Sequence, residues 1–397
     1  MLINCLSLLL IIPAFLVCVY YWYLAVVAIS NLKNEKLFQT EFRNLFAIII
    51  PAHNEEDGLQ ATIDACLKLD YPTEMYEIVV IADNCSDNTA KIAKDNGVTC
   101  LERFDKEKKG KGFALAFAFD HLKQGKHSAY LILDADCQID LDALKIFDHY
   151  LSCGDSVLQS NNIPSNPDEN SMTFAVAVGS TIEHDLFYAP KSQLGLAVFL
   201  GGTGMVITKK ILGQFPWKAS SIVEDVDYAV NLLKENIKIT FVPEVCVKSE
   251  TPVDKEQLDI QRTRWASGNL HFGKTEALKL MMNGLLKRNL RLADAGWTFL
   301  IISRPLILLE LFIAFIIACI GYLLNGSFVA KGLFYLISIV VVMQSLYFLL
   351  GILKLGLSFR RISLLIQAPV VIGRLILISL KGLTGKNLKS WNRTPRG

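Results

Sequence analysis

The sequence YLILDADCQ, from Tyr130 to Gln138, joins an apolar run to an acidic pair. Residues 130–133 have the composition of a buried strand, and Asp134 and Asp136 follow them directly. In a parallel α/β sheet the carboxyl ends of the strands open into the ligand crevice, where carboxylates are natural ligands for a divalent ion that bridges phosphates. An isolated Asp-x-Asp also serves as a turn or a helix cap. The rest of the chain must distinguish a metal and nucleotide diphosphate site from a cap.

Two strands of the same type precede this stretch. Residues 45–50 lead into the segment PAHNEE at Pro51, and residues 77–82 lead into Asp83. Helical patterns follow these strands and precede Tyr130, at 58–69, 84–97 and 108–122. Strands that alternate with helices predict a parallel, doubly wound α/β sheet with right-handed crossovers. The polar strand ends then share one rim, and we expect a nucleotide along it, within a domain that spans 45–270.

Further along, the chain continues with a predicted helix over 142–152, a strand over 156–159 and a polar loop over 161–170. The glycine-rich segment FLGGTG at 199–204 follows. Its glycines let the backbone approach a ligand closely, although a tight turn explains them equally well.

Charged residues at two predicted helix starts have two interpretations each. The basic cluster Lys106–Lys111 lies between a strand and a helix, which favours phosphate contact by Lys111, whereas a solvated loop is the plainer alternative. Glu224 and Asp225 open a helix, where acids are ordinary partners of the helix dipole. The sharper interpretation makes one of them a general base.

The segment QLDIQRTRWASG at 257–268 places Gln261, Arg264 and Trp265 on neighbouring helical turns. Arg264 offers a planar fork for phosphate oxygens, and Trp265 offers a flat face for a sugar ring. A surface ion pair and a core tryptophan are the alternative interpretation.

Composition indicates a membrane protein with a water-facing domain. The 397 residues are 52% hydrophobic, with mean hydropathy +0.36, yet 20% are charged. The net charge of only +2 gives no support to nucleic-acid binding. Nine cysteines without metal-type spacing indicate reduced thiols in a cytosolic compartment.

Apolar segments at both ends predict membrane helices. Residues 1–30 carry no charge and predict an uncleaved transmembrane anchor, and the basic residues after it place the next domain in the cytoplasm. We expect an interfacial helix over 275–295 that meets membrane lipids, and transmembrane or interfacial helices over 297–380. Within them, 297–324 and 333–350 are long enough to span, 362–380 is expected to lie along the interface, and 381–397 forms a basic cytoplasmic tail. Arg304 and Glu310 are costly in a span and suggest a polar cavity.

Taken in order, these motifs resemble those of the membrane-bound family-2 glycosyltransferases, which include cellulose, chitin and hyaluronan synthases and bacterial exopolysaccharide enzymes. The resemblance covers about residues 45–268. It rests on PAHNE at 51–55, Asp83, DAD at 134–136, GGTG at 201–204, ED at 224–225, QRTRW at 261–265 and the tail motif WNRTP at 391–395.

The resemblance implies a GT-A fold, an α/β Rossmann-like mixed sheet, and inverting, metal-dependent transfer of a hexose from a nucleotide sugar, usually a UDP-sugar. It implies that the donor is held by Pro51, Ala52, His53, Asn54, Glu55, Asp83, Lys111 and Asp134. It implies Asp134 and Asp136 as ligands of Mg²⁺ or Mn²⁺, and Asp225 as the general base beside Glu224. Gly202, Thr203, Gly204, Gln261, Arg264 and Trp265 would meet the acceptor and the leaving diphosphate.

Two departures and three alternatives accompany this resemblance. Val223 stands where many members have Thr, and Asn84 and Cys85 follow Asp83 in place of an acid and a glycine. The acceptor is either a growing exopolysaccharide at the cytoplasmic face of a bacterial inner membrane or a lipid-linked acceptor that receives a single sugar. A membrane scaffold or transport subunit with a degenerate nucleotide-binding domain is the non-enzymatic alternative.

Overall fold

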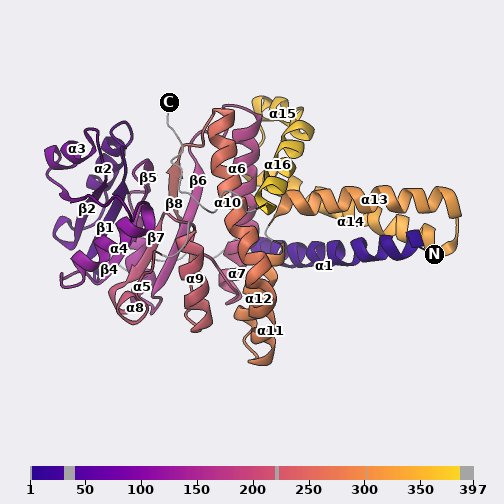
Figure 1. Ribbon diagram of the computed structural model, residues 1–397, viewed down its shortest axis with the longest axis horizontal. Coiled ribbons are helices and arrows are strands. Elements are labelled where there is room, and N and C mark those ends of the chain that lie inside the picture. The colour runs from indigo at the N-terminus through magenta and orange to yellow at the C-terminus, as the bar shows by residue number, and fades with distance from the viewer. Residues whose placement is uncertain (1, 31–40, 220–222, 302, 385–397) are drawn as a thin grey trace.

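The computed structural model describes residues 2–30, 41–219, 223–301 and 303–384. A sheet domain lies at one end of the molecule, and a bundle of long helices projects from the other (Figure 1). Helices α6 (Ser171–Glu183), α10 (Lys255–Thr275) and α16 (Ala368–Leu383) lie between the two parts, and α16 contacts both α10 and α6.

A single mixed sheet organises the first part, with strand order β3-β2-β1-β4-β7-β6-β8-β5. The first four strands in that order are parallel, as the sequence predicts, whereas β7 runs antiparallel to both β4 and β6. The strands are β1 (Phe46–Ala52), β2 (Tyr76–Asp83), β3 (Thr99–Arg103), β4 (Ala129–Ile132), β5 (Cys137–Ile139), β6 (Val157–Pro164), β7 (Met205–Thr208) and β8 (Thr240–Ser249). Because β7 is reversed, its start lies at the rim where β1, β2 and β4 end.

Helices cover both faces of the sheet. Side chains of β1 alternate between the two hydrophobic cores, with Ile49 in one and Ile48 in the other. One core contains residues of α2 (Leu59–Leu67), α3 (Thr89–Asp95) and α5 (Ala143–Ser152). The other contains residues of α4 (Lys111–Leu122), α8 (Lys209–Gln214) and α9 (Glu224–Lys234), and it continues into the projecting helices. The short helices η1 (Thr73–Met75) and α7 (Ala189–Gln193) complete the domain.

The predicted polar loop over 161–170 is partly wrong. Strand β6 continues to Pro164, because Asn161 and the residues after it pair in parallel with β8 past an irregularity at Ser160. Helix α6 (Ser171–Glu183) then begins at a capping box, in which the Asn170 side chain accepts hydrogen bonds from Met172 N and Thr173 N. A π-helical turn, η2 (His184–Tyr188), continues α6.

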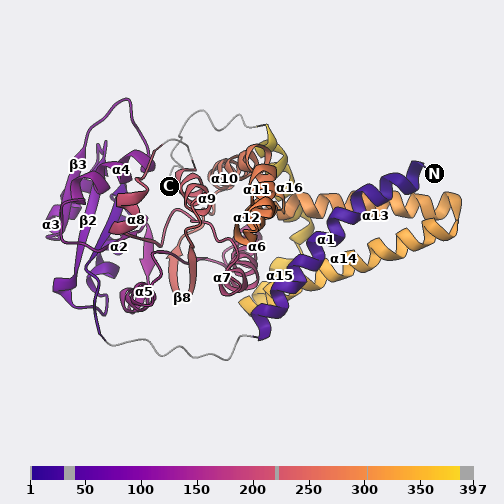
Figure 2. The ribbon, with the colours of Figure 1, turned by 90° about the horizontal axis from the view of Figure 1, so that it is seen from below.

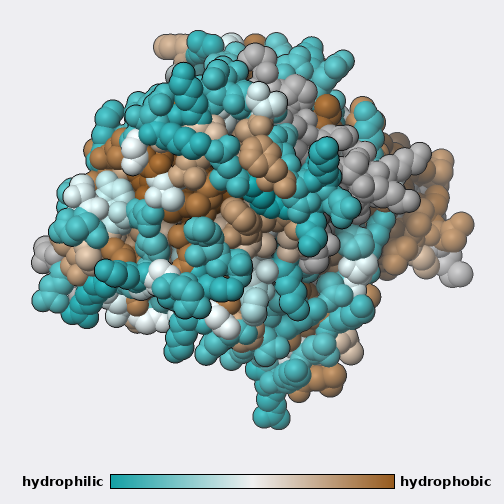
Figure 3. Space-filling view, turned by 60° about the vertical axis from the view of Figure 1, so that its left-hand side comes forward, coloured by the Kyte–Doolittle hydropathy of each residue, from teal (hydrophilic) through white to brown (hydrophobic). Residues whose placement is uncertain are grey.

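Three helices of the described chain are long and apolar enough to cross a membrane. They are α1 (Leu2–Ser30), most of α13 (Arg304–Asn325) and α14 (Phe328–Leu355), and they pack side by side (Figure 2). Helix α1 buries Ile11, Ala14, Cys18, Tyr21 and Ala25 at helical spacing along one stripe. Hydrophilic side chains dominate the sheet domain in Figure 3, whereas the projecting helices are hydrophobic.

The single interfacial helix predicted over 275–295 is wrong. The chain forms a hairpin of α11 (Ala277–Leu286) and α12 (Leu290–Ile301), with Arg288 in a left-handed conformation at the turn. Glycines allow the close approach, since a Cβ on Gly284 would lie 2.2 Å from Ala293 N and one on Gly296 would lie 2.4 Å from Ala277 O. The predicted span over 297–324 is also divided, because its first residues belong to α12 and α13 begins only at Arg304.

The apolar segment 362–380 is likewise not one helix. Helices α15 (Phe359–Leu365) and α16 (Ala368–Leu383) meet at a bend of 57°. An ion pair between Arg361 and Asp168 joins α15 to the sheet domain. A second pair, between Arg374 and Asp259, joins α16 to α10. The expected basic tail from 385 onward, with the WNRTP motif, lies outside the described residues.

Candidate active site

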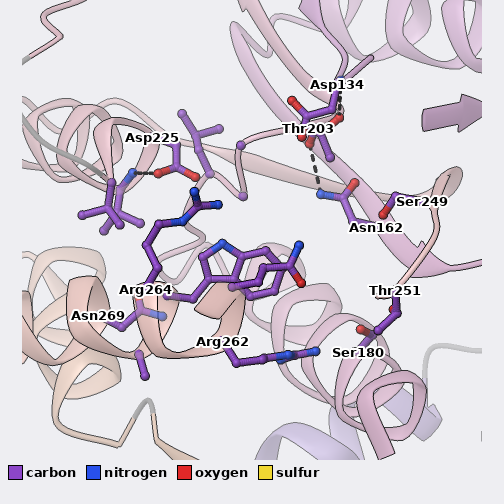
Figure 4. A pocket seen from close by; sticks show the side chains of 18 of the residues that line it. Asp134, Asn162, Ser180, Thr203, Asp225, Ser249, Thr251, Arg262, Arg264 and Asn269 are labelled. Carbon is purple, nitrogen blue, oxygen red and sulfur yellow. Dashed lines mark hydrogen bonds between the residues drawn. The ribbon is translucent and has the colours of Figure 1, made fainter. Parts of the chain in front are cut away.

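The predicted site residues meet in one cavity of about 640 Å³ at the polar rim of the sheet. It runs from the β1 and β2 ends to α6, α10 and α16 (Figure 4). All residues predicted for the site line it except Asn54 and Gly204. Segments more than 200 positions apart in the chain thus contribute to one surface, which the order of the motifs alone does not establish.

At the donor end, the β1 and β2 ends are tied together. His53 Nδ1 lies 2.6 Å from the carbonyl oxygen of Asp83, and Asn54 Oδ1 accepts a hydrogen bond from Ser86 N at 2.7 Å. Asn54 and Asn84 adopt left-handed conformations with φ of 55° and 53°, which asparagine tolerates better than most residues. Asn54 therefore shapes the loop and lies outside the cavity lining.

Asp83 is buried and paired. Its carboxylate accepts a hydrogen bond from Arg103 Nη1 at 2.5 Å and one from Asn84 Nδ2 at 2.9 Å. Both members of the ion pair are less than a tenth exposed. Arg103 also donates to Asp105 and to the Lys108 carbonyl, so it braces the loop that leads to Lys111. Sequence reasoning missed Arg103, which lies at the end of a strand without a recognisable motif.

Lys111 lies at the centre of the cavity. It is the first residue of α4, after Gly110 with φ of 114°. Its ammonium forms an ion pair with Asp134 and donates to the Gly202 carbonyl at 2.7 Å. Burial would lower the pKa of Lys111, but Asp134 outweighs this effect and keeps the pKa above its usual value. Lys111 is therefore a fixed positive charge between the acidic pair and the glycine-rich segment.

Oxygen donors for a divalent ion come from the acidic pair. Ligand atoms of Asp134, Asp136 and Cys137 lie within 4.8 Å of one another. Burial raises the pKa of the Cys137 thiol, and the two carboxylates raise it further. A protonated thiol is a poor ligand for hard cations, whereas carboxylates suit Mg²⁺ and Mn²⁺. The carboxylates of Asp134 and Asp136 are therefore suitable ligands for the predicted metal ion, and they suit Mg²⁺ and Mn²⁺ equally.

The glycine-rich segment joins the metal side to the candidate base. A Cβ on Gly202 would lie 3.3 Å from Asp225 Oδ2 and 3.6 Å from Lys111 Nζ, so this position borders both groups. Gly204 has φ of 64°, and a Cβ there would lie 1.8 Å from Ser160 Oγ. The side chains of Ser160 and Asn162 on β6, together with the positive φ, therefore disfavour any side chain at Gly204.

Two amides of β6 hold this segment, and sequence reasoning missed both. Gln159 and Asn162 donate to the Thr203 carbonyl at 2.9 and 3.0 Å, and Gln159 Oε1 accepts from Gly201 N at 2.8 Å (Figure 4). Thr203 Oγ1 in turn accepts a hydrogen bond from Asp134 N at 3.0 Å. In the sequence, Gln159 and Asn162 belong to a run of polar residues after a strand, and such a run is typical of a loop.

Glu224 and Asp225 begin α9, as predicted. Asp225 Oδ1 accepts a hydrogen bond from its neighbour Val226 N at 2.8 Å. Burial, together with the charge of Asp225, raises the pKa of Glu224 to about 7. Burial also raises the pKa of Asp225, although Lys111 counteracts part of this effect. Two adjacent carboxyls with raised pKa values in a cavity are typical of acid–base chemistry.

Helix α10 (Lys255–Thr275) forms the opposite wall. Arg264 extends from it toward Asp225, while Arg262 extends toward the side lined by Ser180 and Thr251 (Figure 4). Arg262 lies over the Trp265 ring, 5.2 Å from its centroid. The helix approaches α9 closely at Gly268, where a Cβ would lie 2.3 Å from Val223 Cγ1. Val223, which replaces the usual Thr, therefore fixes the spacing between α10 and the acidic pair.

These features define a fold of the GT-A type, and comparisons with known proteins agree. The model of the glycosyltransferase like family 2 matches residues 43–268. A probable glucomannan 4-beta-mannosyltransferase of Arabidopsis thaliana is 28% identical over 59% of this chain and 47% of its own length. The beta-monoglucosyldiacylglycerol synthase of Trichormus variabilis is 29% identical over 56% and 48%, and the poly-beta-1,6-N-acetyl-D-glucosamine synthase of Staphylococcus aureus is 26% identical over 63% and 60%.

The chain belongs to glycosyltransferase family 2, because the family model covers more than half of it. It spans about half the length of the curated relatives that it matches. Among solved structures, the mannosyltransferase PcManGT from Pyrobaculum calidifontis, in complex with GDP-Man and Mn²⁺, shares the fold with a TM-score of 0.62 at 16% identity. That similarity covers 97% of this chain and 99% of the other. It confirms the predicted GT-A architecture with its helices.

Proposed function

We propose that this chain transfers a sugar, with inversion, from a nucleotide sugar to a hydroxyl of an acceptor at the cytoplasmic face of a membrane. The observation that carries the proposal is the meeting of three groups in one cavity: the Asp134–Asp136 pair, the Glu224–Asp225 pair and Arg264 of α10. A UDP-sugar is the donor that the family motifs favour, and hexose is the class of sugar.

The donor's nucleoside is assigned to the 51–55 loop and the neighbourhood of Asp83. Its diphosphate would lie between Lys111 and Arg264, whose positive charges stabilise the charge that accumulates on the leaving group. Asp134 and Asp136 would hold Mg²⁺ or Mn²⁺, which supplies Lewis-acid stabilisation of the diphosphate. Two fixed cations and an acidic pair within one cavity support this assignment.

Asp225 is proposed as the general base. It removes the proton of the acceptor hydroxyl while the new bond from that oxygen to the anomeric carbon forms. The bond from the anomeric carbon to the diphosphate breaks on the opposite side, and the nucleoside diphosphate leaves. General base catalysis of this kind contributes ~10²- to 10⁴-fold. Glu224 lies beside the base, and burial and the charge of Asp225 raise its pKa to about 7. Trp265, which is 44% exposed, offers its ring to the acceptor sugar.

The orientation in the membrane is proposed from charge. Three helices among the described residues can cross, and basic residues follow α1 and α14, a distribution of charge that supports a sheet domain on the cytoplasmic side. The relatives include enzymes named for polysaccharides and one named for a glycolipid, so both a growing glycan and a lipid-linked acceptor remain candidates.

A transfer assay on membranes that contain the full chain tests this function. UDP-glucose, UDP-N-acetylglucosamine, UDP-galactose and GDP-mannose are supplied in turn as labelled donors with Mg²⁺ or Mn²⁺, and the products are sized. We expect incorporation from one donor, lost on addition of EDTA and restored by the metal. Long lipase-resistant chains would identify a processive synthase, and one sugar in a butanol-soluble lipid would identify a single-transfer enzyme. Incorporation that resists EDTA would contradict the metal assignment.

A further inference from the structure

The cavity extends beyond the residues that the transfer reaction uses. Past Trp265 its walls come from α6, from the junction of α12 with α13, and from α16. Glu183, Arg262 and Arg304 line this part, which we call the membrane-side chamber. It adjoins the projecting helices, because Gly351 of α14 packs against Ile182, the residue before Glu183.

The three charged residues that define the membrane-side chamber carry one net positive charge, and the exposed Glu250 lines the cavity next to Thr251. Arg304 Nη1 pairs with Glu183 at 3.2 Å, which neutralises one guanidinium. Arg262 forms no ion pair among the described residues, and burial lowers the pKa of His184 so that it stays neutral. The Nε atoms of both Arg262 and Arg304 are buried, and no described residue accepts a hydrogen bond from either.

Two guanidinium groups whose buried Nε donors lack an acceptor carry a cost that an anion with free oxygens would offset. A neutral glycan would supply hydroxyls but no compensating charge for Arg262. A phosphate supplies both charge and several acceptor oxygens, and the planar guanidinium matches it in two-point geometry. The chemistry of the chamber thus selects a phosphate over an uncharged sugar.

Apart from Ser379, the wall of the chamber formed by α16 is apolar on both sides. Leu375 and Ile378 line the cavity, while Ile372, Leu377 and Leu380 of the same helix are exposed. Large exposed apolar side chains on a helix at the base of the membrane helices are typical of contact with lipid. One helix therefore separates the chamber from the lipid-facing surface, which an acyl or prenyl chain would follow.

We propose that the acceptor is an amphiphile whose sugar is linked to a lipid phosphate, with the phosphate held by Arg262 and Arg304. The proposal rests on the function proposed above and names the substrate class. The sugar hydroxyl reaches Asp225 past Trp265, the phosphate occupies the membrane-side chamber, and the hydrocarbon chain passes along α16. Because Asp225 is a base for a hydroxyl, the phosphate is a recognition group and is not the nucleophile.

Binding of dodecyl phosphate to the purified full chain tests this proposal without requiring turnover. The protein is held in an uncharged detergent, and bound probe is measured at equilibrium beside dodecyl maltoside, which has a neutral headgroup, and inorganic phosphate. We expect dodecyl phosphate to bind at least tenfold more tightly than either comparison, because it alone combines charge with an apolar chain. Equal binding of dodecyl maltoside would overturn the proposal, and equal binding of inorganic phosphate would replace the lipid by a water-soluble sugar phosphate.

Variants assign the binding to the chamber. Arg262→Gln should weaken dodecyl phosphate by about tenfold or more, and Arg262→Lys should recover part of the loss. Arg360→Gln is the matched control, because Arg360 is exposed on α15 and lies outside the cavity. Unchanged binding in Arg262→Gln would refute the assignment, and the comparison of probes on the unmodified chain holds even if that variant does not fold.

Asp225→Asn separates this inference from the proposed function. It should bind dodecyl phosphate as the unmodified chain does while losing transfer. If transfer fails with every donor but the phosphate probe still binds through Arg262, the chamber assignment stands and the reaction is wrong.

Discussion

Asp225 and Glu224 share a cavity that disfavours their ionised forms. Because burial raises both pKa values, that of Glu224 to about 7, the base is protonated and inactive at pH values where an exposed Asp would be ionised. We therefore predict that, as the pH decreases, the rate at saturating donor and metal begins to fall at a higher pH than the ordinary pKa of an aspartate would give. A pH–rate profile measures this, and an acidic limb near pH 4 would contradict it.

Glu224→Gln tests whether the Glu224–Asp225 pair determines the acidic limb of the pH–rate profile. It removes the member of this interacting pair whose pKa is raised to about 7, so an acidic limb that belongs to the pair should move to lower pH. A limb that does not move would show that another group controls the rate.

At the scale of the secondary-structure elements, the contact between α10 and the start of α9 positions the acidic pair. Gly268→Ala would place its Cβ against Val223, so we predict a loss of about 1–3 kcal/mol of unfolding free energy and a decrease in kcat as Glu224 and Asp225 shift. Thermal unfolding and steady-state kinetics check both. The double variant Gly268→Ala with Val223→Ala should recover activity, because the obstructing methyls are gone.

Gly179→Ala is the control for helix propensity. A Cβ at Gly179 of α6 meets nothing within 4 Å, so alanine there should stabilise the fold by about 0.5–1 kcal/mol. If Gly268→Ala leaves the unfolding free energy unchanged or raises it, as Gly179→Ala is expected to do, the tight α9–α10 contact is not present in solution.

Elements with a strong hydrophobic pattern were predictable, and those defined by distant partners were not. The strands before Pro51, Asp83 and Asp134 are confirmed within one or two residues. The extension of β6 was missed because its asparagines look like a loop, and only the pairing of their backbone with β8 makes them a strand. The α11–α12 hairpin was missed because Gly284 and Gly296 act through their close contacts with the facing helix, and the sequence does not show which helix that is.

For the site, the motifs predicted which residues gather but not how they are paired. Lys111 was expected to contact phosphate, and the structure adds its ion pair with Asp134. Arg262 stands within QRTRW, yet its different direction from Arg264 depends on the helix packing around it (Figure 4). The roles assigned to these residues stay predictions until they are tested.

At the scale of the whole molecule, a buried ion pair joins α7 of the sheet domain to α12, and through Asp294 to the projecting helix α1. Lys191 of α7 pairs with Asp294 of α12 at 2.9 Å, and Asp294 also accepts hydrogen bonds from Tyr20 of α1 and Ala197 N. Lys191 is fully buried. We predict that Lys191→Met destabilises the protein by about 3–5 kcal/mol, because it leaves Asp294 buried without a compensating charge.

Denaturation of the purified chain in detergent measures this effect. Lys123→Met is the control, since the Lys123–Asp120 pair is exposed and should contribute less than about 1 kcal/mol. Adding Asp294→Leu to Lys191→Met should recover much of the loss. Equal stability of both single variants would show that the buried pair does not join the two parts.

The central claim is that Asp225 is the base of a glycosyl transfer in this cavity. The measurement that tests it most directly compares turnover and donor binding in Asp225→Asn with the same quantities in Asp227→Asn, a substitution of the same type two positions along α9 and outside the cavity lining. We predict that Asp225→Asn lowers turnover by ~10²- to 10⁴-fold with donor affinity nearly unchanged, while Asp227→Asn stays close to the unmodified chain. Turnover retained in purified Asp225→Asn would contradict the account.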